Sequence, residues 1–325
     1  MKAAVRAAYW VWRRELHVMM RAPILYVVGG VFLVVQGVAF AGLVGALSDP
    51  RKPAPLGALL EGQLAGTLLT WVLSLVVLTL LGMRTIAEDK RSGAWELLLT
   101  AQVGEGAAVV GKWLAASTLY AILWLPTLAY LGVVAIYRAD DGGWDVAAIA
   151  CGYAGAIAIG AALLAWSVAA SAAMSSTLGA GALGFALLIG IFLIGELPSL
   201  WPELDPGLAS VLAGVSVRST ALAFARGEIT GGALVLVGGL AVLGLALAIT
   251  LACAGRRRSA EVRTRTLGTL ALAAIALLAG ALAARHPARL DVSADRRNTL
   301  DPATIAVLAA LPGPAALTIV RPTLG

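Results

Sequence analysis

The chain has 325 residues, of which 60% are hydrophobic and only 13% are charged. Soluble domains usually carry about 25% charged residues, so the composition excludes a soluble globular protein and predicts an integral membrane protein. The formal net charge of +6 does not indicate nucleic-acid binding, because the basic residues cluster at the ends of apolar segments, where they set the orientation of a membrane protein.

Residues 1–22 precede the first long apolar segment and have the pattern of a basic amphipathic helix. Apolar and basic positions fall on opposite sides of a helical wheel, with Val5, Tyr9, Trp12, Leu16 and Met19 on the apolar side and Arg6, Arg13, Arg14 and His17 on the basic side. Trp and Tyr suit a membrane interface, and Pro23 separates this helix from the next segment. We predict an interfacial helix here, with a simple extension of the first span as the alternative.

Seven apolar segments are long enough for membrane-spanning helices, which need about 20 residues each. They are residues 23–47, 59–82, 113–137, 146–174, 177–197, 232–254 and 266–284. Only Ser175 and Ser176 separate the fourth segment from the fifth, which predicts a tight helical hairpin. Residues 198–231 form the longest loop between spans, and we interpret it either as short helices at the outer interface or as a plain connector.

The distribution of Lys and Arg predicts a cytoplasmic N-terminus. With that orientation, the inner segments hold 14 of these residues and the outer loops hold five, counted over the six-span region and the linker that follows it. Positive charge is enriched on the cytoplasmic side of membrane proteins. The charged segment 83–112 is then cytoplasmic, and the segment that follows the seventh span is extracytoplasmic.

Residues 286–325 change to soluble character. Asp301 and Pro302 predict the start of a short helix over 302–311, residues 312–314 end it, and residues 317–320 read as a strand. One helix and one strand cannot bury a core, so we interpret this tail as the beginning of an α/β domain.

The spans hold no ionisable residue near their centres, and all 18 acidic residues lie in loops or at span ends. Ion-coupled carriers usually need such groups within the membrane, so the pattern disfavours secondary transport and an intramembrane hydrolase. Residues 106–113 nearly match a phosphate-binding loop, but Trp113 replaces the Ser or Thr of that motif. We interpret Lys112 as a cytoplasmic anchor of the third span, and we expect neither a cofactor nor a metal in this chain.

The charged segment 83–112 carries the predicted mechanism. We expect the second span to run to about Arg91, with a break at Ser92-Gly93 and a short helix over 94–101 for which Ser92 is the N-cap. Trp95, Leu98 and Leu99 would form an exposed apolar knob that fits a groove on a soluble partner, beside the charged residues Glu88, Asp89, Arg91 and Glu96. A solvated loop with its apolar face on the membrane is the alternative.

Two glycines of the second span, Gly62 and Gly66, have the spacing that permits close helix approach. Packing within the chain explains this spacing, and an interface with a second subunit is the sharper alternative.

The run from Met83 to Val103, followed by Val-Val-Gly-Lys-Trp at 109–113, resembles the ABC type-2 permeases, particularly their GldF and NosY-like branch. The residues that match the motif are Glu88, Gly93, Glu96, Leu97, Leu98 and Lys112, and residues 224–229 are similar to the outer segment before the sixth span. The resemblance covers roughly residues 5–255. It implies an all-α bundle of six spans with an N-terminal elbow helix and a coupling helix near 88–101 that docks on a separate ABC ATPase.

The tail resembles the beginning of the GldG-type auxiliary domain of such transporters, although most of that domain is missing from the match. The matching residues are Arg289, Leu290, Asp291, Asp295, Arg297, Thr299, Leu300 and Thr304. The predicted organisation is therefore an elbow helix (1–22), a permease domain (23–255), a basic linker with a seventh span (256–285) and an incomplete auxiliary domain (286–325).

Together these observations predict the permease subunit of an ATP-driven exporter in a bacterial inner membrane. Two copies of a partner ATPase would bind ATP and Mg²⁺, and a second permease subunit, identical or different, would complete the assembly. The predicted ATPase-coupling residues are Glu88, Arg91, Gly93, Trp95, Glu96, Leu97, Leu98 and Leu99, and Gly62 and Gly66 are the candidates for the subunit interface. A non-transporting scaffold of a gliding-motility or secretion machine is the alternative, and a secondary carrier is disfavoured.

Overall fold

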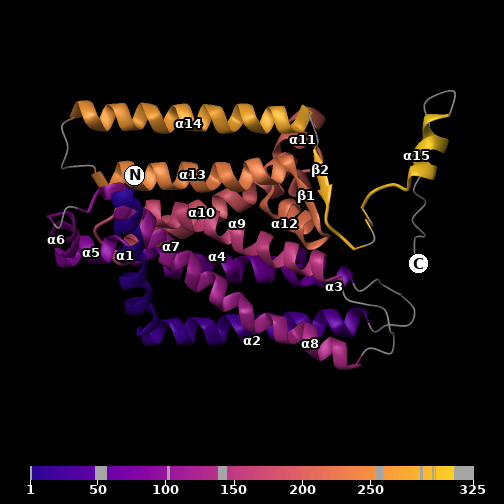
Figure 1. The fold of residues 1–325 in the computed structure, drawn as a ribbon, viewed down its shortest axis with the longest axis horizontal. Coiled ribbons are helices and arrows are strands. Elements are labelled where there is room, and N and C mark those ends of the chain that lie inside the picture. Colours follow the sequence, from indigo (N-terminus) through magenta and orange to yellow (C-terminus); the bar gives the residue numbers. More distant parts are fainter. Residues whose placement is uncertain are drawn as a thin grey trace.

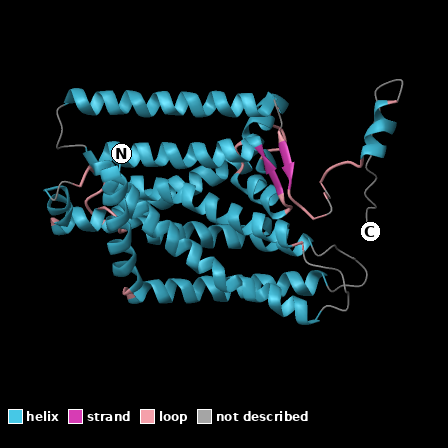
Figure 2. Ribbon diagram, viewed as in Figure 1, coloured by secondary structure: helices cyan, strands magenta, loops and turns pink. Residues whose placement is uncertain are grey.

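The computed structural model is almost entirely helical, with a single two-stranded ladder in the part it describes (Figure 2). It describes residues 2–47, 57–100, 103–137, 145–253, 259–285, 288–294, 296 and 298–310. The long helices run side by side, so the molecule has two ends (Figure 1). We call the end that holds α1, α5 and α6 the proximal end, and the end that holds α3, α11, α12 and the strands the distal end.

Helix α1 (Lys2–Met20) crosses the direction of the long helices at the proximal end (Figure 1). The chain turns at Arg21 and Ala22, whose amides donate to the carbonyls of Val18 and Met19, and α2 (Pro23–Leu47) begins at the proline. Pro is well suited to the first position of a helix, because its fixed φ is helical and its missing N–H would have no partner there. The predicted amphipathic helix is therefore a separate element, and the alternative of an extended first span is wrong.

The second predicted span is interrupted near the distal end. Helix α3 (Gly57–Glu61) continues into the π-helical turn η1 (Gly62–Gly66), and Thr67 is extended, with φ −109° and ψ 142°. Thr67 then caps α4 (Leu68–Met83) by accepting a hydrogen bond from the Thr70 amide. At the proximal end the chain continues into α5 (Ala87–Ser92) and α6 (Ala94–Thr100), as the sequence predicted.

The middle of the chain supplies the centre of the bundle. Its elements are α7 (Glu105–Trp124), the short 3₁₀ turn η2 (Leu125–Thr127), α8 (Leu128–Tyr137), α9 (Val146–Ala173) and α10 (Thr177–Leu200). Pro126 lies in η2, where a proline interrupts the helical hydrogen bonds. Helix α9 packs against α4, α7, α10, α12 and α13, which makes it the central helix of the fold.

The distal end is built from short elements. They are α11 (Pro206–Gly214), α12 (Val217–Ala225) and β1 (Glu228–Thr230), and the chain then returns through α13 (Gly231–Cys253) and α14 (Ser259–Arg285) to β2 (Arg289–Asp291) and α15 (Pro302–Ala309). The loop 198–231 contains the short helices that the sequence predicted, and their position at an outer membrane interface stays a prediction. Strand β1 pairs antiparallel with β2, with Ile229 opposite Leu290.

Six helical segments in the described residues are long and apolar enough to cross a membrane. They are Pro23–Ala46, Leu68–Ser92, Glu105–Ile136, Val146–Ala173, Thr177–Leu200 and Gly231–Cys253. The chain is therefore an all-α, multi-pass membrane protein. The seventh predicted span falls on α14, which lies beside α13 (Figure 1) but is not among these six, so its passage through a membrane stays a prediction.

The core of the bundle contains an aromatic cluster around Trp124. Phe32, Tyr120 and Tyr153 each make an edge-to-face contact with the Trp124 ring, with ring centroids 5.5 to 6.3 Å apart. Gly160 of α9 faces this cluster, because a Cβ there would lie only 1.9 Å from a Tyr120 ring carbon. This glycine lets a tyrosine ring pack directly on the backbone of the central helix.

The ladder attaches the beginning of the tail to the distal end. The Val292 amide donates to the Gly227 carbonyl and the Ala294 amide donates to Asp145. The helix predicted after Asp301 is present as α15, and the Ala303 amide donates to the Asp301 carboxylate at 3.3 Å. The strand predicted over 317–320 lies outside the described residues.

Candidate functional site

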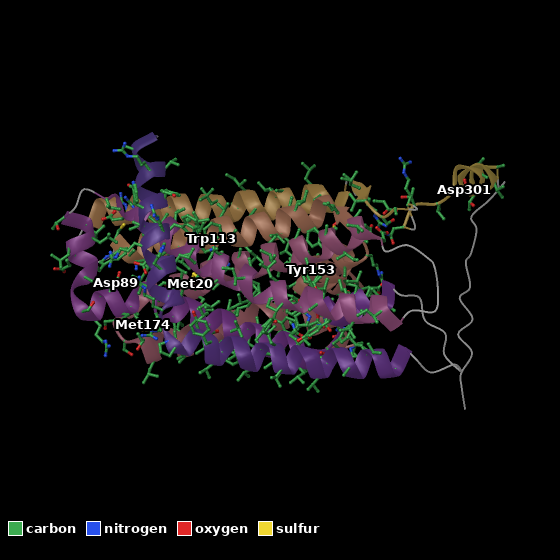
Figure 3. The ribbon with its side chains drawn as sticks, turned by 60° about the horizontal axis from the view of Figure 1, so that its bottom comes forward. Met20, Asp89, Trp113, Tyr153, Met174 and Asp301 are labelled. Atoms are coloured by element: carbon green, nitrogen blue, oxygen red, sulfur yellow. The ribbon has the colours of Figure 1, made fainter. Side chains whose placement is uncertain are left out.

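A buried lysine joins three helices at the proximal end. Lys112 of α7 is only 1% exposed, and its Nζ lies 2.9 Å from Oε1 of Glu15 in α1 and 2.7 Å from Oδ2 of Asp89 in α5. Figure 3 shows Asp89 at this end, among the nitrogen and oxygen atoms that gather there. We call Glu15, Asp89 and Lys112 the charge triad.

A glycine beside the lysine explains why α1 approaches so closely. A Cβ at Gly111 would lie 2.7 Å from both the carbonyl oxygen of Ala8 and the Cβ of Val11. The two helices are also joined by the indole N–H of Trp12, which donates to the Thr118 hydroxyl at 3.0 Å. The backbone contact at Gly111 brings Glu15 within reach of Lys112.

The start of α5 is held by a serine from the central helix. The hydroxyl of Ser171 in α9 accepts hydrogen bonds from the amides of Ile86 and Ala87, at 3.1 and 3.0 Å, and donates to the Met83 carbonyl at 2.9 Å. Free amides at a helix start need such acceptors. Lys90 of α5 also donates to the Ala172 carbonyl at the end of α9. Helix α5 is therefore attached to α9 as well as to α7.

The tryptophan that we expected in an exposed knob is buried. Trp95 is 3% exposed and packs in a small core with residues of α7, α9 and α13, and Leu98 and Leu99 are partly buried against the same core. Gly93 turns the chain between α5 and α6 with φ 76°, a left-handed conformation that favours glycine. This turn directs Trp95 back into the bundle, so the prediction of an exposed Trp95 is wrong.

The outer surface of α5 and α6 is formed by other residues. Leu97 is 72% exposed, and Glu96 and Arg91 are exposed beside it. Glu88 is half-buried and forms a bidentate ion pair with Arg84, at 2.7 and 3.0 Å. Ser92 does not cap α6, since its hydroxyl donates to the Asp89 carbonyl instead. The predicted coupling residues thus divide into an inner set, which includes Trp95, and an exposed set of Arg91, Glu96 and Leu97.

The buried side chains of Trp95, Leu98 and Leu99 help to make the α5–α6 segment a rigid extension of the bundle. Removing one partner of a buried ion pair costs about 3–5 kcal/mol, and the charge triad adds this constraint to the bonds of Ser171 and Lys90. A force applied to the exposed face of α6 would therefore act on α1, α7, α9 and α13 together.

A second polar cluster ties the neighbouring helices together at the same end. The thiol of Cys253 in α13 donates to Glu105 of α7 at 2.9 Å, and Arg265 of α14 donates to the Cys253 sulfur at 3.1 Å. Arg265 also pairs with Glu105 at 3.5 Å. Through this cluster α14 joins the proximal assembly.

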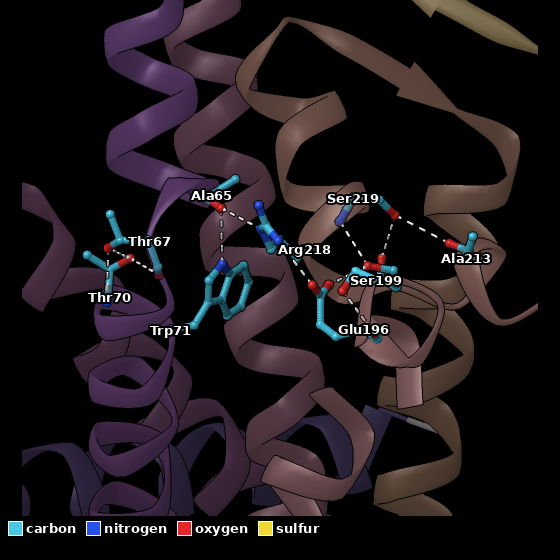
Figure 4. A network of polar contacts seen from close by, with 10 residues as sticks. Ala65, Thr67, Thr70, Trp71, Glu196, Ser199, Ala213, Arg218 and Ser219 are labelled. Atoms are coloured by element: carbon cyan, nitrogen blue, oxygen red, sulfur yellow. Dashed lines mark hydrogen bonds and ion pairs between the residues drawn. The ribbon is translucent and has the colours of Figure 1, made fainter. Parts of the chain in front are cut away.

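The distal end contains a different polar network around the break in the second span (Figure 4). The Ala65 carbonyl accepts from the indole of Trp71 at 3.4 Å and from Arg218 of α12 at 3.3 Å. Arg218 also pairs with Glu196 of α10 at 3.0 Å, and Glu196 accepts from the Ser216 hydroxyl. These bonds satisfy a carbonyl that the interrupted helix leaves free and hold η1 against α10 and α12.

The tail has its own polar centre at this end. Asp291 accepts hydrogen bonds from the amide and hydroxyl of Ser293, at 3.0 and 2.6 Å, and from Asn298 and Thr299, at 2.9 and 3.0 Å. Desolvation favours the neutral acid, but these bonds to the ionised form outweigh it and lower the pKa of Asp291 to about 2.

The two candidate glycines of the subunit interface differ in their surroundings. A Cβ at Gly62 would lie 2.5 Å from Leu43 of α2, so this glycine permits packing within the chain. Gly66 is exposed beside Leu68 and Leu69, which are 66% and 61% exposed.

Several residues of these sites escaped the sequence reasoning. Lys112 was interpreted as an anchor at the membrane surface, yet it is buried between two carboxylates. Glu15 was not singled out, although a lone acid within a basic amphipathic helix is a visible signal. The role of Ser171 was missed, because hydrogen bonds between distant segments leave no local pattern.

No protein-family model matches the chain, and no curated protein matches its sequence.

Proposed function

We propose that the chain is the permease subunit of an ATP-driven ABC exporter and that it couples a separate ATPase to the movement of substrate across the membrane. The observation that carries this proposal is the α5–α6 segment. It presents an exposed face at one end of a multi-pass bundle, while its inner side is attached to α7, α9 and α13 by buried contacts.

The exposed face has the composition of a docking surface. Leu97 offers an apolar side chain, and Arg91 and Glu96 offer charges of both signs beside it. In this proposal Leu97 is the apolar centre of the contact with the ATPase and the two charges belong to its polar rim. An ATPase bound here would pull on α6, and the buried contacts would transmit that displacement as a rigid-body movement of the spans.

The bundle itself supports a passive role. In the described residues of the six spans, the Asp, Glu, Lys and Arg side chains lie towards the ends, where several of them take part in the charge triad and the distal network. An ion-driven carrier needs a titratable or ion-binding group within the membrane. The driving force would then come from ATP, which two partner ATPases bind together with Mg²⁺.

A working transporter of this type would contain a second permease subunit. The exposed surface of Gly66, Leu68 and Leu69 is the candidate for that contact, since the neighbouring Gly62 already packs against Leu43.

Affinity purification from native membranes in a mild detergent tests the proposal. We expect the wild-type chain to retain an ABC ATPase and the Glu96→Ala, Leu97→Ala double variant to lose at least five-sixths of it, because both side chains are exposed and their removal leaves the core intact. Leu178→Ala is the matched control, since Leu178 is an 84% exposed leucine at the start of α10.

Two results would contradict the proposal. The first is a purified chain that retains no ATPase under conditions in which its fold is intact, and the second is a chain that hydrolyses ATP alone. Equal ATPase recovery with the double variant and the wild type would remove the α6 face from the interface.

The distal ladder favours a second candidate function, a non-transporting membrane scaffold. The tail from Arg289 to Thr299 is hydrogen-bonded to the distal end, which would present whatever follows it at a fixed position. Deletion of residues 288–310 distinguishes the two, because ATPase recovery should survive it in a permease, whereas a scaffold should lose its partners.

A further inference from the structure

A cavity lies inside the bundle, away from the charge triad and next to the distal polar network, with which it shares Trp71. Its walls come from α2, η1, α4, α7, α9 and α12, and about 20 Å³ of it is open to the centre of a water molecule. One water needs about 10–15 Å³ by this measure. The cavity therefore has room for at least one water or for a group of similar size.

Two glutamine side chains line this cavity without a protein partner. Gln36 of α2 is 0% exposed and Gln63 of η1 is 3% exposed. Within the part of the chain that the structure describes, neither amide forms a hydrogen bond through its nitrogen or its oxygen. In a bilayer each unsatisfied polar group costs several kcal/mol, so the amides of both residues need a partner from outside the protein.

The remaining walls define what that partner can be. None of the described lining residues carries a positive charge, so the walls offer no counter-charge for a phosphate or a carboxylate. The Ser74 hydroxyl donates to the Thr70 carbonyl, and its oxygen remains an acceptor. The Thr70 hydroxyl donates to the Thr67 carbonyl and also lies 2.9 Å from the Thr67 hydroxyl, so the Thr70 oxygen keeps one lone pair. Trp71, Tyr120 and Trp124 supply aromatic faces. Amides, hydroxyls and aromatic faces around a space of this size suit a single neutral hydroxyl group.

We propose that this cavity binds a hydroxyl-bearing group of an uncharged sugar or polyol, with the amides of Gln36 and Gln63 as its hydrogen-bonding partners. Each primary amide offers a donor and an acceptor, which matches the dual character of a hydroxyl. The hydroxyl group enters the space that water fills in its absence. This inference deepens the proposed function by naming a substrate class, and it rests on that function only for the direction of transport.

The distal wall of the cavity suggests how the ligand would leave. Gln63 and Leu64 belong to η1, and Ala221 belongs to α12 one turn after Arg218. The same η1 and α12 are held together by the bond between Arg218 and the Ala65 carbonyl, while Trp71 donates to that carbonyl and lines the cavity. Separation of η1 from α12 would therefore open the wall beside Gln63.

Binding is tested with the full chain in phosphatidylcholine nanodiscs, because maltoside detergents would themselves supply a sugar. The first probe is methyl β-glucoside, observed by saturation-transfer-difference NMR, and its charged match is glucose 6-phosphate. The second probe is a glucosyl diacylglycerol built into the nanodisc, observed by native mass spectrometry. The two probes distinguish a free sugar from a lipid headgroup.

Gln36→Leu and Gln63→Leu are the decisive variants. Leucine has nearly the volume of glutamine, so each variant should fold and should unfold at a higher temperature than the wild type in the absence of ligand. Each should lose at least five-sixths of the binding signal of whichever probe binds. Val38→Leu is the matched control on α2, since Val38 is 66% exposed and does not line the cavity.

The expected result is binding of at least one neutral probe to the wild type and to Val38→Leu, with no binding of glucose 6-phosphate. Absence of binding by both neutral probes, or equal binding by the glutamine variants, would overturn the inference. This experiment contains no ATPase, so its failure would leave the coupling role untouched, and loss of the coupling role would leave the binding result standing.

Discussion

The two ends of the bundle hold their elements together in different ways. At the proximal end, Lys112 is 1% exposed between two carboxylates, whereas at the distal end Arg218 is 47% exposed where it pairs with Glu196. Exposed ion pairs contribute about 0–1 kcal/mol, while breaking a buried one costs about 3–5 kcal/mol. The comparison indicates that α5 is fixed to the bundle by a buried ion pair, whereas the exposed ion pair of Arg218 adds little to the apolar packing that holds α12 against η1.

Substitution of the buried lysine should give the largest effect. Lys112→Met leaves Glu15 and Asp89 buried without their cation, and we expect a loss of about 3–5 kcal/mol in the free energy of unfolding, measured by thermal or denaturant unfolding in detergent. Arg91→Met is the control, because Arg91 is an exposed cation of the same segment. The triple variant Lys112→Met, Glu15→Gln, Asp89→Asn should recover much of the loss. Equal stability of Lys112→Met and the wild type would show that the triad does not fasten α5.

The glycine beside the triad should be the next most sensitive position. Gly111→Ala places a Cβ 2.7 Å from the Ala8 carbonyl, and overpacking of this kind costs about 1–3 kcal/mol. Gly106→Ala on the same helix meets only Ile249, at 3.8 Å, and should be neutral or more stable by up to about 1 kcal/mol. If the two variants unfold at the same temperature, α1 does not depend on close contact with α7.

The distal network should respond weakly in stability. Arg218→Leu removes the ion pair with Glu196 and one of two donors to the Ala65 carbonyl, and we expect a loss of no more than about 1 kcal/mol. The informative measurement is the accessibility of a cysteine introduced at Gln63, whose alkylation rate should rise in the Arg218→Leu background. A large loss of stability with unchanged accessibility would contradict a separable η1.

The smallest effect should come from the tail at acid pH. The pKa of Asp291 is lowered to about 2 in the folded chain, against about 3.9 for a free side chain. Its contribution is therefore complete above pH 4 and is lost as the pH falls towards 2. The distribution of distances between spin labels at positions 208 and 304 should broaden as the pH falls from 4 towards 2. In Asp291→Asn it should be broad already at pH 5 and should show no further change.

The sequence predicted most of the elements but few of the contacts between them. The apolar segments, the amphipathic helix before Pro23, the turn at Gly93 and the helix after it all carry local patterns, and the structure has them. The burial of Trp95 was missed, because the sequence around Gly93 predicts a turn but not the direction in which the next helix runs. The interruption at η1 was also missed, because Thr67 is an ordinary residue in this sequence and the side chain that binds the Ala65 carbonyl there, Arg218, lies 153 residues away.

The functional interpretation divides in the same way. The predicted coupling segment stands at one end of the bundle, but its exposed face was identified only from the structure, as Leu97 rather than Trp95. Gln36 had a visible signal as the one amide within the first apolar segment. Its position beside Gln63 in one cavity could not be predicted, because it depends on the tertiary packing of α2 against η1.

The pairing of β1 with β2 has a mechanical consequence for the last two long helices. Strand β1 leads into α13 and strand β2 follows α14, so the chain joins these helices at one end and the ladder clamps them at the other. A hairpin closed at both ends resists splaying and can tilt only as a unit. Any change in the tilt of α13 would then move β2 as well, so the position of the tail would depend on the tilt of α13.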